Sequence, residues 1–340
     1  MNTEEMLLQQ MQQMQETINK LADQQTTRET LKGDTIPFID YMERWLEGDH
    51  DWRINTAERY KDLYRLHIKP FFQGVMLSEV DYDMLDAYIR DRKSCLSSGT
   101  VQKLKTCLIS PALKKAVIRK LIKDNPATLL DTVKVKNKHK RALLDEEIVK
   151  LNEVSRSHRL WIAIPLLLYT GMRRSELLGL RWTDIDFKQK TININRDFVS
   201  TRTKGNILTD TKTEGSARPV SIPSGLVAML ENYRSTEGKG KTYVISQSKQ
   251  DKQVDPHNFS RLFRKWCTKA DIKGISPHST RHTYCTMATE EGIDTFTIMR
   301  QVGHTTSRML ESVYVHKRTN EMQERGAEKL GAVLDNLMGA

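Results

Sequence analysis

Residues 160–176 read LWIAIPLLLYTGMRRSE, an apolar run that stops at a glycine and is followed by two arginines. The run from Leu160 to Tyr169 predicts a buried helix, because it is apolar on nearly every face. Gly171 is the residue type that most often follows the end of a helix, since it adopts a left-handed backbone without strain. Arg173 is therefore expected in a turn, or in the first turn of the next helix, directly after a buried element.

Further elements are predicted on both sides of this segment. Acidic residues at 145–147 lie where a helix would begin, at the positive end of its dipole. Helices are predicted over residues 258–270, 279–291, 295–300 and 321–337, and strands over 191–199, 217–222 and 243–245. The chain from residue 143 onward is therefore expected to be mainly α with a small antiparallel β-sheet.

Residues 35–130 predict a separate, all-helical unit. After a first amphipathic helix, a second is expected from Asn55, a candidate N-cap, to a stop at Pro70. Two or three more helices follow before residue 122. The alternating lysines of residues 131–142 predict a charged, extended linker between the two units.

Basic residues outnumber acidic ones: 54 lysines and arginines stand against 43 aspartates and glutamates, and the net charge is +11. Such an excess favours a polyanionic partner, most often nucleic acid, although a merely solvated basic surface would show the same excess. The candidate DNA-contacting side chains are lysines of one predicted helix and of the linker. They are Lys103, Lys105, Lys134, Lys136, Lys138 and Lys140.

Several classes of protein are disfavoured by the composition. No apolar run reaches about 18 residues, so no membrane-spanning helix is expected, and no apolar signal core stands near the N-terminus. The four cysteines are scattered without a CxxC pair, which argues against a zinc site and fits a reducing cytoplasm. Because no carboxylate cluster suggests a metal, neither a metal nor a cofactor is expected.

Residues 1–34 form a segment of their own. Apolar residues recur there at spacings of 4 and 3, as in the seam of a coiled coil, and a linker begins near Thr26. The seam consists of Leu7, Met11, Met14, Ile18 and Leu21. A self-associating helix and a helix that packs on its own chain or frays are both compatible with this pattern.

Six residues in the second half of the chain have side chains suited to one reaction. In chain order they are Arg173, Lys212, His278, Arg281, His304 and Tyr314. A phosphodiester resists nucleophilic attack because it is anionic. Fixed cations around one protein nucleophile are therefore what phosphoryl transfer without a metal requires.

The arginines have the clearest chemistry. A guanidinium presents a planar fork of donors that matches two phosphate oxygens and stays charged at physiological pH. Arg173 and Arg281 together could hold both non-bridging oxygens of a phosphate. The alternative for Arg173 is an ordinary ion pair with Glu176, three residues further on. Arg174, the next residue, is expected at the surface.

The other candidates depend on a helix start and on one phenol. Pro277 favours a helix beginning there, so His278 and Arg281 are expected to project to one side, while His282 is expected to point elsewhere. Tyr314 is the candidate nucleophile. Because a phenol has an ordinary pKa of about 10, it needs nearby cations or a base to attack at neutral pH.

In this order the motifs resemble those of the tyrosine recombinases, the phage integrase family. The resemblance extends over about residues 35 to 320. The organisation it implies is a leading helix and linker at 1–34, a helical core-binding domain at 35–130, a basic linker at 131–142, a catalytic domain at 143–320 and a C-terminal exchange helix at 321–340.

The resemblance also implies roles for single residues. Glu176 would occupy an accessory acidic position that holds the first arginine. Lys212, on a β-hairpin, would protonate the 5′-oxygen leaving group, with Lys204 on the same hairpin as the second candidate. His304 would donate to a phosphate oxygen, and Tyr314 would form a 3′-phosphotyrosine link. No metal and no cofactor is implied.

The activity implied is site-specific recombination of duplex DNA attachment sites, as in the integration and excision of a phage or conjugative element. Four protomers would exchange strands through a Holliday junction, with the helix at 321–340 docking on a neighbour. Directionality or DNA-bending proteins would assist, in a bacterial cytoplasm near the nucleoid. The alternatives are a chromosome dimer resolvase of the same family, a type IB-like topoisomerase and a catalytically silent DNA-binding protein.

Overall fold

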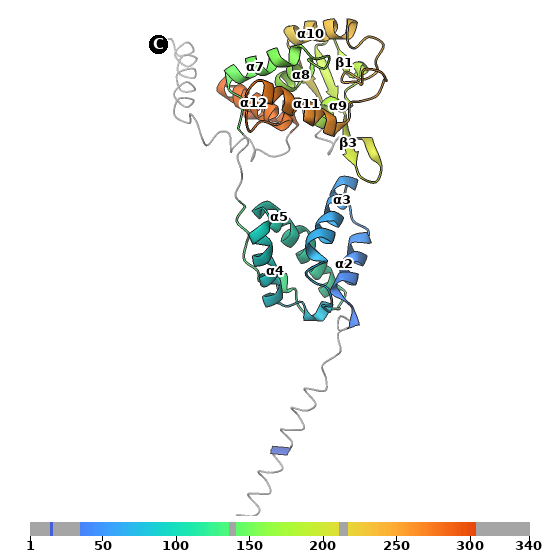
Figure 1. Cartoon of the computed structure of the whole chain (residues 1–340), viewed down its shortest axis with the longest axis vertical. Coiled ribbons are helices and arrows are strands. Elements are labelled where there is room, and N and C mark those ends of the chain that lie inside the picture. Colours follow the sequence, from blue (N-terminus) through green and yellow to red (C-terminus); the bar gives the residue numbers. More distant parts are fainter. Residues whose placement is uncertain (1–13, 16–34, 136–140, 211–216, 304–340) are drawn as a thin grey trace, which may run out of the picture. The chain divides into compact units, whose positions relative to one another are not determined.

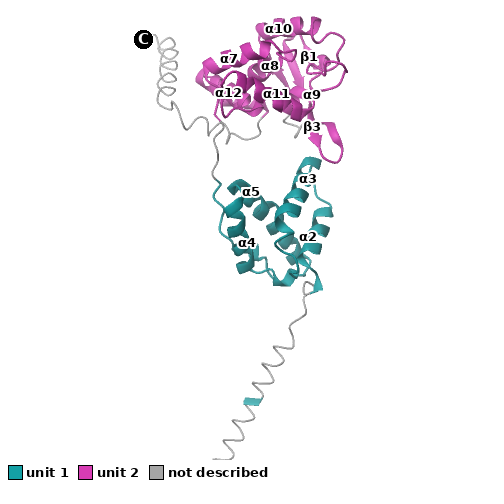
Figure 2. Cartoon of the chain, viewed as in Figure 1, with its two compact units in different colours: residues 1–137 teal, residues 138–340 magenta. Residues whose placement is uncertain are grey.

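The computed structural model describes residues 14–15, 35–135, 141–210 and 217–303. The chain divides into two compact units, residues 1–137 and 138–340 (Figure 2). Several predicted features lie outside the described residues. They are most of the heptad seam, the C-terminal helix, Lys136, Lys138, Lys140, Lys212, His304 and Tyr314.

The described part of the first unit is helical. Its α-helices are α2 (Phe38–Glu47), α3 (Ile54–Leu63), α4 (Tyr82–Cys95), α5 (Ser98–Lys103) and α6 (Ser110–Ile118). Two π-helical turns, η2 (Tyr64–Ile68) and η4 (Leu104–Ile109), continue α3 and α5, and two 3₁₀ turns are η3 (Leu77–Glu79) and η5 (Pro126–Thr128). The second helix begins one residue before the predicted cap: Arg53 occupies the N-cap position and Asn55 lies inside the helix.

Local caps and an aromatic core explain this arrangement. The carboxylate of Asp81 accepts a hydrogen bond from the Met84 amide at 2.8 Å and so starts α4. Phe72 lies at the centre of the core, with its ring 4.8 Å from that of Phe38 and 5.1 Å from that of Tyr88. All three side chains are buried, so the helices close around one apolar interior.

The second unit combines helices with short strands (Figure 1). Its helices are α7 (Asp145–Arg156), α8 (Ala163–Thr170), α9 (Arg174–Gly179), α10 (Ser224–Ser235), α11 (Pro256–Lys269), α12 (Pro277–Glu290) and α13 (Thr295–Val302), with a 3₁₀ turn η6 (Trp182–Asp184). Its strands are β1 (Ile185–Asp186), β2 (Thr191–Ile194), β3 (Arg196–Thr201), β4 (Gly205–Asp210) and β5 (Arg218–Ser221). The prediction of a mainly α fold with small antiparallel sheet structure is confirmed.

The strands differ from the prediction in their grouping. Within the described residues β1, β2 and β5 form one antiparallel sheet, and β3 pairs with β4 in another. The expected strand at 191–199 is thus two strands that belong to different sheets. The hairpin partner β4 was not predicted, and residues 243–245 form no strand, since only Tyr243 makes an isolated bridge, to Arg181.

Helix α8 is the centre of this unit, as its apolar sequence predicts. It packs against α7, α9, α10 and α12. Gly171 ends it with a left-handed backbone, φ +62°, and its amide donates to the Leu167 carbonyl. A β-carbon at Gly171 would lie 2.8 Å from the Tyr284 ring and 2.9 Å from Val302, so only glycine allows α12 and α13 to approach this closely.

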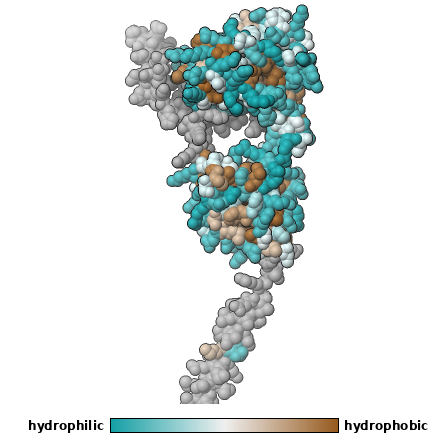
Figure 3. Space-filling model, viewed as in Figure 1, coloured by the Kyte–Doolittle hydropathy of each residue, from teal (hydrophilic) through white to brown (hydrophobic). Residues whose placement is uncertain are grey.

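Capping interactions also fix α12. Pro277 is its first residue, and the amide of Ser276 donates to the Ser279 hydroxyl at 3.1 Å. One turn on, the Thr283 hydroxyl accepts from the Leu143 amide at 2.9 Å, which ties the helix to the start of the unit. On the face drawn in Figure 3, each unit presents hydrophilic side chains interrupted by apolar patches.

Candidate functional site

Arg173 occupies the N-cap position of α9, directly after the buried helix, as the sequence predicts. Its Nη1 donates to Oε1 of Glu176 at 2.6 Å, and its backbone amide donates to Oε2 at 2.8 Å. Its Nη2 donates to the Gly303 carbonyl at 3.1 Å. The side chain is 30% exposed, so the guanidinium is held in place and still reaches the surface.

Arg218 belongs to the same cluster and was not predicted as a site residue. It lies at the start of β5, where Nη1 and Nη2 each donate to a different oxygen of Glu176 at 3.1 Å. Its Nε donates to the Gln301 carbonyl at 2.7 Å. One signal was available: in the alternating stretch 217–222, Arg218 falls on the same face as Val220 and Ile222, and a charge on an apolar face requires a buried partner.

Glu176 is ionised at the centre of these contacts. Burial by itself raises the pKa of this carboxyl group, but the hydrogen bonds and charge of Arg218, followed by the charge of Arg173, lower it further than burial raises it. Its side chain is only 1% exposed. One buried carboxylate therefore fixes two arginines from separate elements.

Arg281 brings a third guanidinium to this region. It projects from the second turn of α12, is 1% exposed, and donates through Nη1 to the Gly171 carbonyl at 2.8 Å. Burial and then the positive charge of Arg173 lower its pKa. Among the described residues, these three arginines meet the single carboxylate of Glu176, and a bound anion would stabilise the resulting positive charge.

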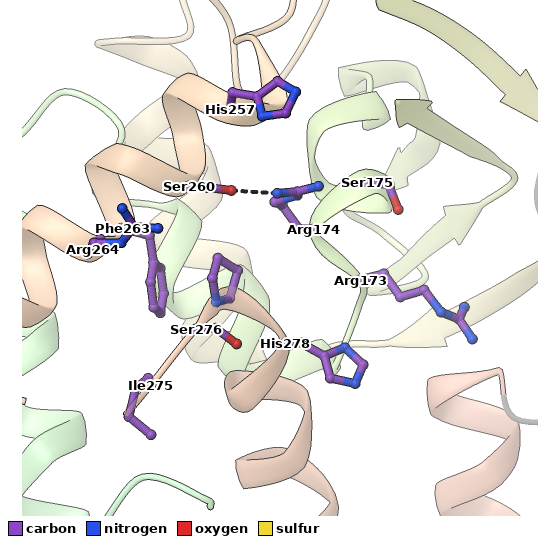
Figure 4. A pocket seen from close by; sticks show the side chains of 11 residues that line it. Arg173, Arg174, Ser175, His257, Ser260, Phe263, Arg264, Ile275, Ser276 and His278 are labelled. Atoms are coloured by element: carbon purple, nitrogen blue, oxygen red, sulfur yellow. Dashed lines mark hydrogen bonds between the residues drawn. The ribbon is translucent and has the colours of Figure 1, made fainter. Parts of the chain in front are cut away.

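His278 is half-buried at the start of the same helix and lines a cavity together with Arg173 (Figure 4). Its ring lies 5.8 Å from the ring of His282, nearly perpendicular to it. The expectation that His282 points elsewhere was wrong, because the two histidines are four residues apart on one helix and share a face.

The remaining site candidates fall into two groups. Lys204, the second candidate for the hairpin lysine, is exposed in the turn between β3 and β4. The sequence places Lys212 in the turn that would join the predicted strands at 191–199 and 217–222. Because β4 (Gly205–Asp210) intervenes, Lys212 instead follows β4 in the chain. It lies outside the described residues, as do His304 and Tyr314; His304 comes directly after Gly303, whose carbonyl accepts from Arg173.

The lysines proposed to contact DNA also differ from one another. Lys105 donates through Nζ to the carbonyls of Leu130 at 2.6 Å and Asp131 at 2.9 Å, and burial lowers its pKa. Its ammonium is therefore committed within the first unit. Lys103 is half-buried and Lys134 is exposed, while Lys136, Lys138 and Lys140 lie outside the described residues.

Two kinds of feature are absent from the described residues. Over 35–135, 141–210 and 217–303 no group of three or more His, Cys, Asp or Glu side chains is arranged to hold a metal ion. In the same ranges, none of the helices combines the length and apolar character that crossing a membrane demands.

Two family models match the sequence. The model described as "Phage integrase family" matches residues 141–321. The model described as "Phage integrase, N-terminal SAM-like domain" matches residues 38–81. The first model therefore covers more than half of the 340 residues, including Arg173, Glu176, Arg218 and Arg281.

Known proteins similar to this chain include recombinases and integrases. A XerC-like tyrosine recombinase of Caldanaerobacter subterraneus subsp. tengcongensis is 30% identical over 203 residues, which are 53% of this chain and 52% of that protein. The ICEBs1 integrase of Bacillus subtilis is 25% identical over 298 residues, 84% of this chain and 79% of the relative. The match thus spans only about half the length of the first relative.

One solved structure of similar fold is that of the Tn1549 transposon integrase in complex with a circular intermediate DNA. It is 18% identical with a TM-score of 0.77, and the match covers 87% of this chain and 100% of that one. At this identity, the likeness concerns the fold.

Proposed function

Because the chain belongs to the phage integrase family, we propose that it is a site-specific DNA recombinase that cuts and rejoins duplex DNA through a 3′-phosphotyrosine intermediate. The observation that carries the proposal is the cationic cluster of the second unit. Glu176 holds Arg173 at the surface and Arg218 in the interior, and Arg281 adds a third guanidinium. A phosphodiester whose two non-bridging oxygens are both bound during the reaction needs such a group of fixed, oriented donors.

In this reaction the arginines act on the phosphate. Arg173 and Arg281 bind the two non-bridging oxygens and stabilise the extra negative charge of the pentavalent transition state. Because Glu176 already fixes Arg173, little side-chain reorganisation accompanies the reaction. His278, on the same helix as Arg281, donates to a phosphate oxygen or accepts a proton near neutral pH.

The covalent step makes one bond and breaks another. The phenol oxygen of Tyr314 attacks phosphorus, and its proton passes to a base. The bond from phosphorus to the 5′-oxygen breaks, and Lys212 gives that oxygen a proton, leaving a 5′-hydroxyl. The new phosphotyrosine ester conserves the energy of the broken phosphodiester bond, so a 5′-hydroxyl from another strand can displace Tyr314 without ATP. His304 donates to the phosphate during both steps.

For the biological role we favour integration and excision of a mobile element. The ICEBs1 integrase aligns with 84% of this chain, whereas the XerC-like recombinase aligns with 53%, although at higher identity. The partners proposed are duplex attachment sites, further copies of the chain in a tetramer that forms a Holliday junction, and accessory proteins that bend DNA or set direction. We place the reaction in the bacterial cytoplasm.

Covalent capture tests the proposed chemistry. Wild-type and Tyr314→Phe proteins are mixed with sheared DNA from the source organism and denatured with SDS, and the ends of protein-bound fragments are sequenced. We expect one short site to be enriched by the wild type only, while both proteins bind duplex equally. A Tyr314→Phe protein that still forms the adduct would show that another residue is the nucleophile.

Covalent capture, plasmid relaxation and mass measurement together separate the alternatives. A catalytically silent DNA-binding protein would retain duplex and enrich no ends. A topoisomerase would relax supercoiled plasmid as a monomer and form no junctions, and a dimer resolvase would enrich a chromosomal site rather than the ends of an element. The mass of the protein on a captured site, with and without residues 1–26, tests both the tetramer and a role of the leading segment in assembly.

A further inference from the structure

Arg174 is not a simple surface residue, although it was expected to be one. It is the first residue of α9 and is half-buried against α11. Its Nη1 donates to the Ser260 hydroxyl and, at 3.5 Å, to the Pro256 carbonyl. Ser260 in turn donates to the same carbonyl at 3.0 Å. Figure 4 shows the two neighbouring arginines diverging, with Arg174 directed toward Ser260 and Arg173 directed away from it.

The charge of Arg174 is not neutralised by an ion pair in the described part of the chain, where its guanidinium donates to a hydroxyl and a carbonyl. The carboxylate of Asp255 raises the pKa of Arg174 by its negative charge, but it already caps α11 by accepting from the amides of His257 and Asn258 and also accepts from the Asn206 side chain. Burial lowers the pKa of Arg174 despite this carboxylate. A partly desolvated cation of this kind favours an anionic ligand.

A cavity of about 570 Å³ opens beside this side chain. Arg174, His257 and Arg264 line it on one side, and Arg173 and His278 line it on the other (Figure 4). The described residues that line it include no aspartate or glutamate. The cavity therefore concentrates positive charge and hydrogen-bond donors, with Ser175 and Ser260 adding hydroxyl groups.

We propose that this cavity is a second phosphate subsite, in which Arg174, His257 and Arg264 bind a backbone phosphate of the DNA next to the one held by Arg173 and Arg281. The inference rests on the proposed function. Nη1 of Arg174 is taken by Ser260, and the guanidinium still presents further N–H donors from a fixed plane. Arg173 and Arg174 both line the cavity and their side chains diverge, which suits two neighbouring phosphates of one strand.

The subsite positions the DNA and takes no part in the bond changes. With one phosphate bound by Arg174 and the next by Arg173, the strand is fixed in position and direction, so that the reacting phosphate meets the nucleophile in a defined geometry. Ser260 contributes by holding the Arg174 guanidinium. Arg174 and Ser260 are therefore positioning residues, in contrast to the groups that contact the reacting phosphate.

The salt dependence of duplex binding tests the subsite. Binding of a short duplex of mixed sequence is measured against salt concentration for wild type, Arg174→Gln and Arg264→Gln. Each variant is expected to lower the slope of log K against log salt by about 1, since one phosphate contact is lost, and to weaken binding roughly tenfold. Arg174→Lys should restore the slope and only part of the affinity, because a lysine keeps the charge without the fork.

Lys269→Gln is the matched control. Lys269 is exposed at the end of α11, the helix that carries His257 and Arg264. It lies about 18 Å along the helix axis from His257 and does not line the cavity. Lys269→Gln should leave the salt slope at the wild-type value. If Arg174 only ties α9 to α11, Arg174→Gln will lower the melting temperature but will also leave the salt slope at the wild-type value. That result would refute the subsite. If the wild type itself neither binds duplex nor forms a covalent adduct, the proposed function fails instead.

Discussion

Arg218 and Glu176 form a two-point ion pair in the interior of the second unit, with both N–H···O distances at 3.1 Å and side chains 4% and 1% exposed. The same carboxylate accepts a hydrogen bond from Arg173. A residue of β5 thereby fixes the guanidinium that emerges at the surface from α9. The orientation of Arg173 depends on a contact that lies entirely inside the protein.

Removing one member of this pair should be costly in two ways. Arg218→Gln leaves the Glu176 charge buried with one arginine fewer, so we expect the free energy of unfolding to fall by about 3–5 kcal/mol. We also expect slower adduct formation on DNA, because Arg218 no longer holds Glu176, the partner of Arg173. Urea unfolding and single-turnover capture measure the two effects. The double variant Arg218→Met/Glu176→Met should recover stability but not the rate; recovery of both would show that the pair does not position Arg173.

The pair also predicts how stability depends on pH. The pKa of Glu176 is lower in the folded protein than in the unfolded chain, so its ionised form contributes stability above the ordinary carboxyl pKa of about 4.3. That contribution is lost as the pH falls through the lower folded-state pKa. The stability difference between wild type and Glu176→Gln should therefore shrink below about pH 4.

Glu147 provides the control for this titration. Arg141 lowers the pKa of Glu147, but Arg141 is 43% exposed, so solvent screens the pair. Glu147→Gln should give a smaller stability difference that shrinks over the same pH range. A difference for Glu176→Gln that stays constant under acid would contradict the assignment of an ionised, buried Glu176.

Two glycines with similar backbones separate packing from strain. Gly171 (φ +62°) and Gly240 (φ +71°) both have left-handed conformations, but a β-carbon at Gly240 would meet nothing within 4 Å, whereas one at Gly171 would meet Tyr284 at 2.8 Å. Gly240→Ala should cost about 1–2 kcal/mol from the backbone alone. Gly171→Ala should lower the free energy of unfolding by about 1–3 kcal/mol more, because its β-carbon also collides with Tyr284. Thermal unfolding of the two variants measures the stability that each loses. Equal losses of stability would mean that α12 moves away from residue 171 without an energetic cost.

The hairpin lysines can be told apart by the leaving group. If Lys212 protonates the 5′-oxygen, Lys212→Ala should slow cleavage about 10²–10⁴-fold, and Lys204→Ala should change it little. A substrate with sulfur in place of the 5′-oxygen should restore cleavage by Lys212→Ala, because a thiolate, with a parent pKa of about 8.5, leaves without a proton. If the sulfur substrate restores cleavage by Lys204→Ala and not by Lys212→Ala, Lys204 is the residue that protonates the 5′-oxygen.

Local signals in the sequence predicted much of the fold. The apolar run and Gly171 predict helix α8 and its end, although α8 begins at Ala163, three residues after the predicted start, and Pro277 marks the start of α12. Strand β4 was missed because its sequence, Gly205–Asp210, alternates weakly, and its pairing with β3 is a tertiary contact. The π-helical turns η2 and η4 likewise leave no local signal, since their residues are ordinary helix formers.

Within the described residues, the sequence predicted one contact of the site and missed others. The ion pair of Arg173 with Glu176 follows from their spacing of three, and the structure contains it. Arg218 was passed over because its carboxylate partner is 42 residues away in the chain, and Arg174 was expected at the surface because only the packing of α11 buries it. Both errors concern long-range contacts, which spacing along the chain does not encode.

Gly303 shows what such contacts mean for the sequences this fold accepts. Its backbone has φ +66°, and a β-carbon there would lie 2.8 Å from Nη1 of Arg218. Alanine at 303 would displace Arg218, and a smaller residue at 218 would leave Glu176 without its main partner. We therefore expect positions 176, 218 and 303 to be epistatic: the effect of a change at one depends on the residues at the other two, although the three are far apart in the chain.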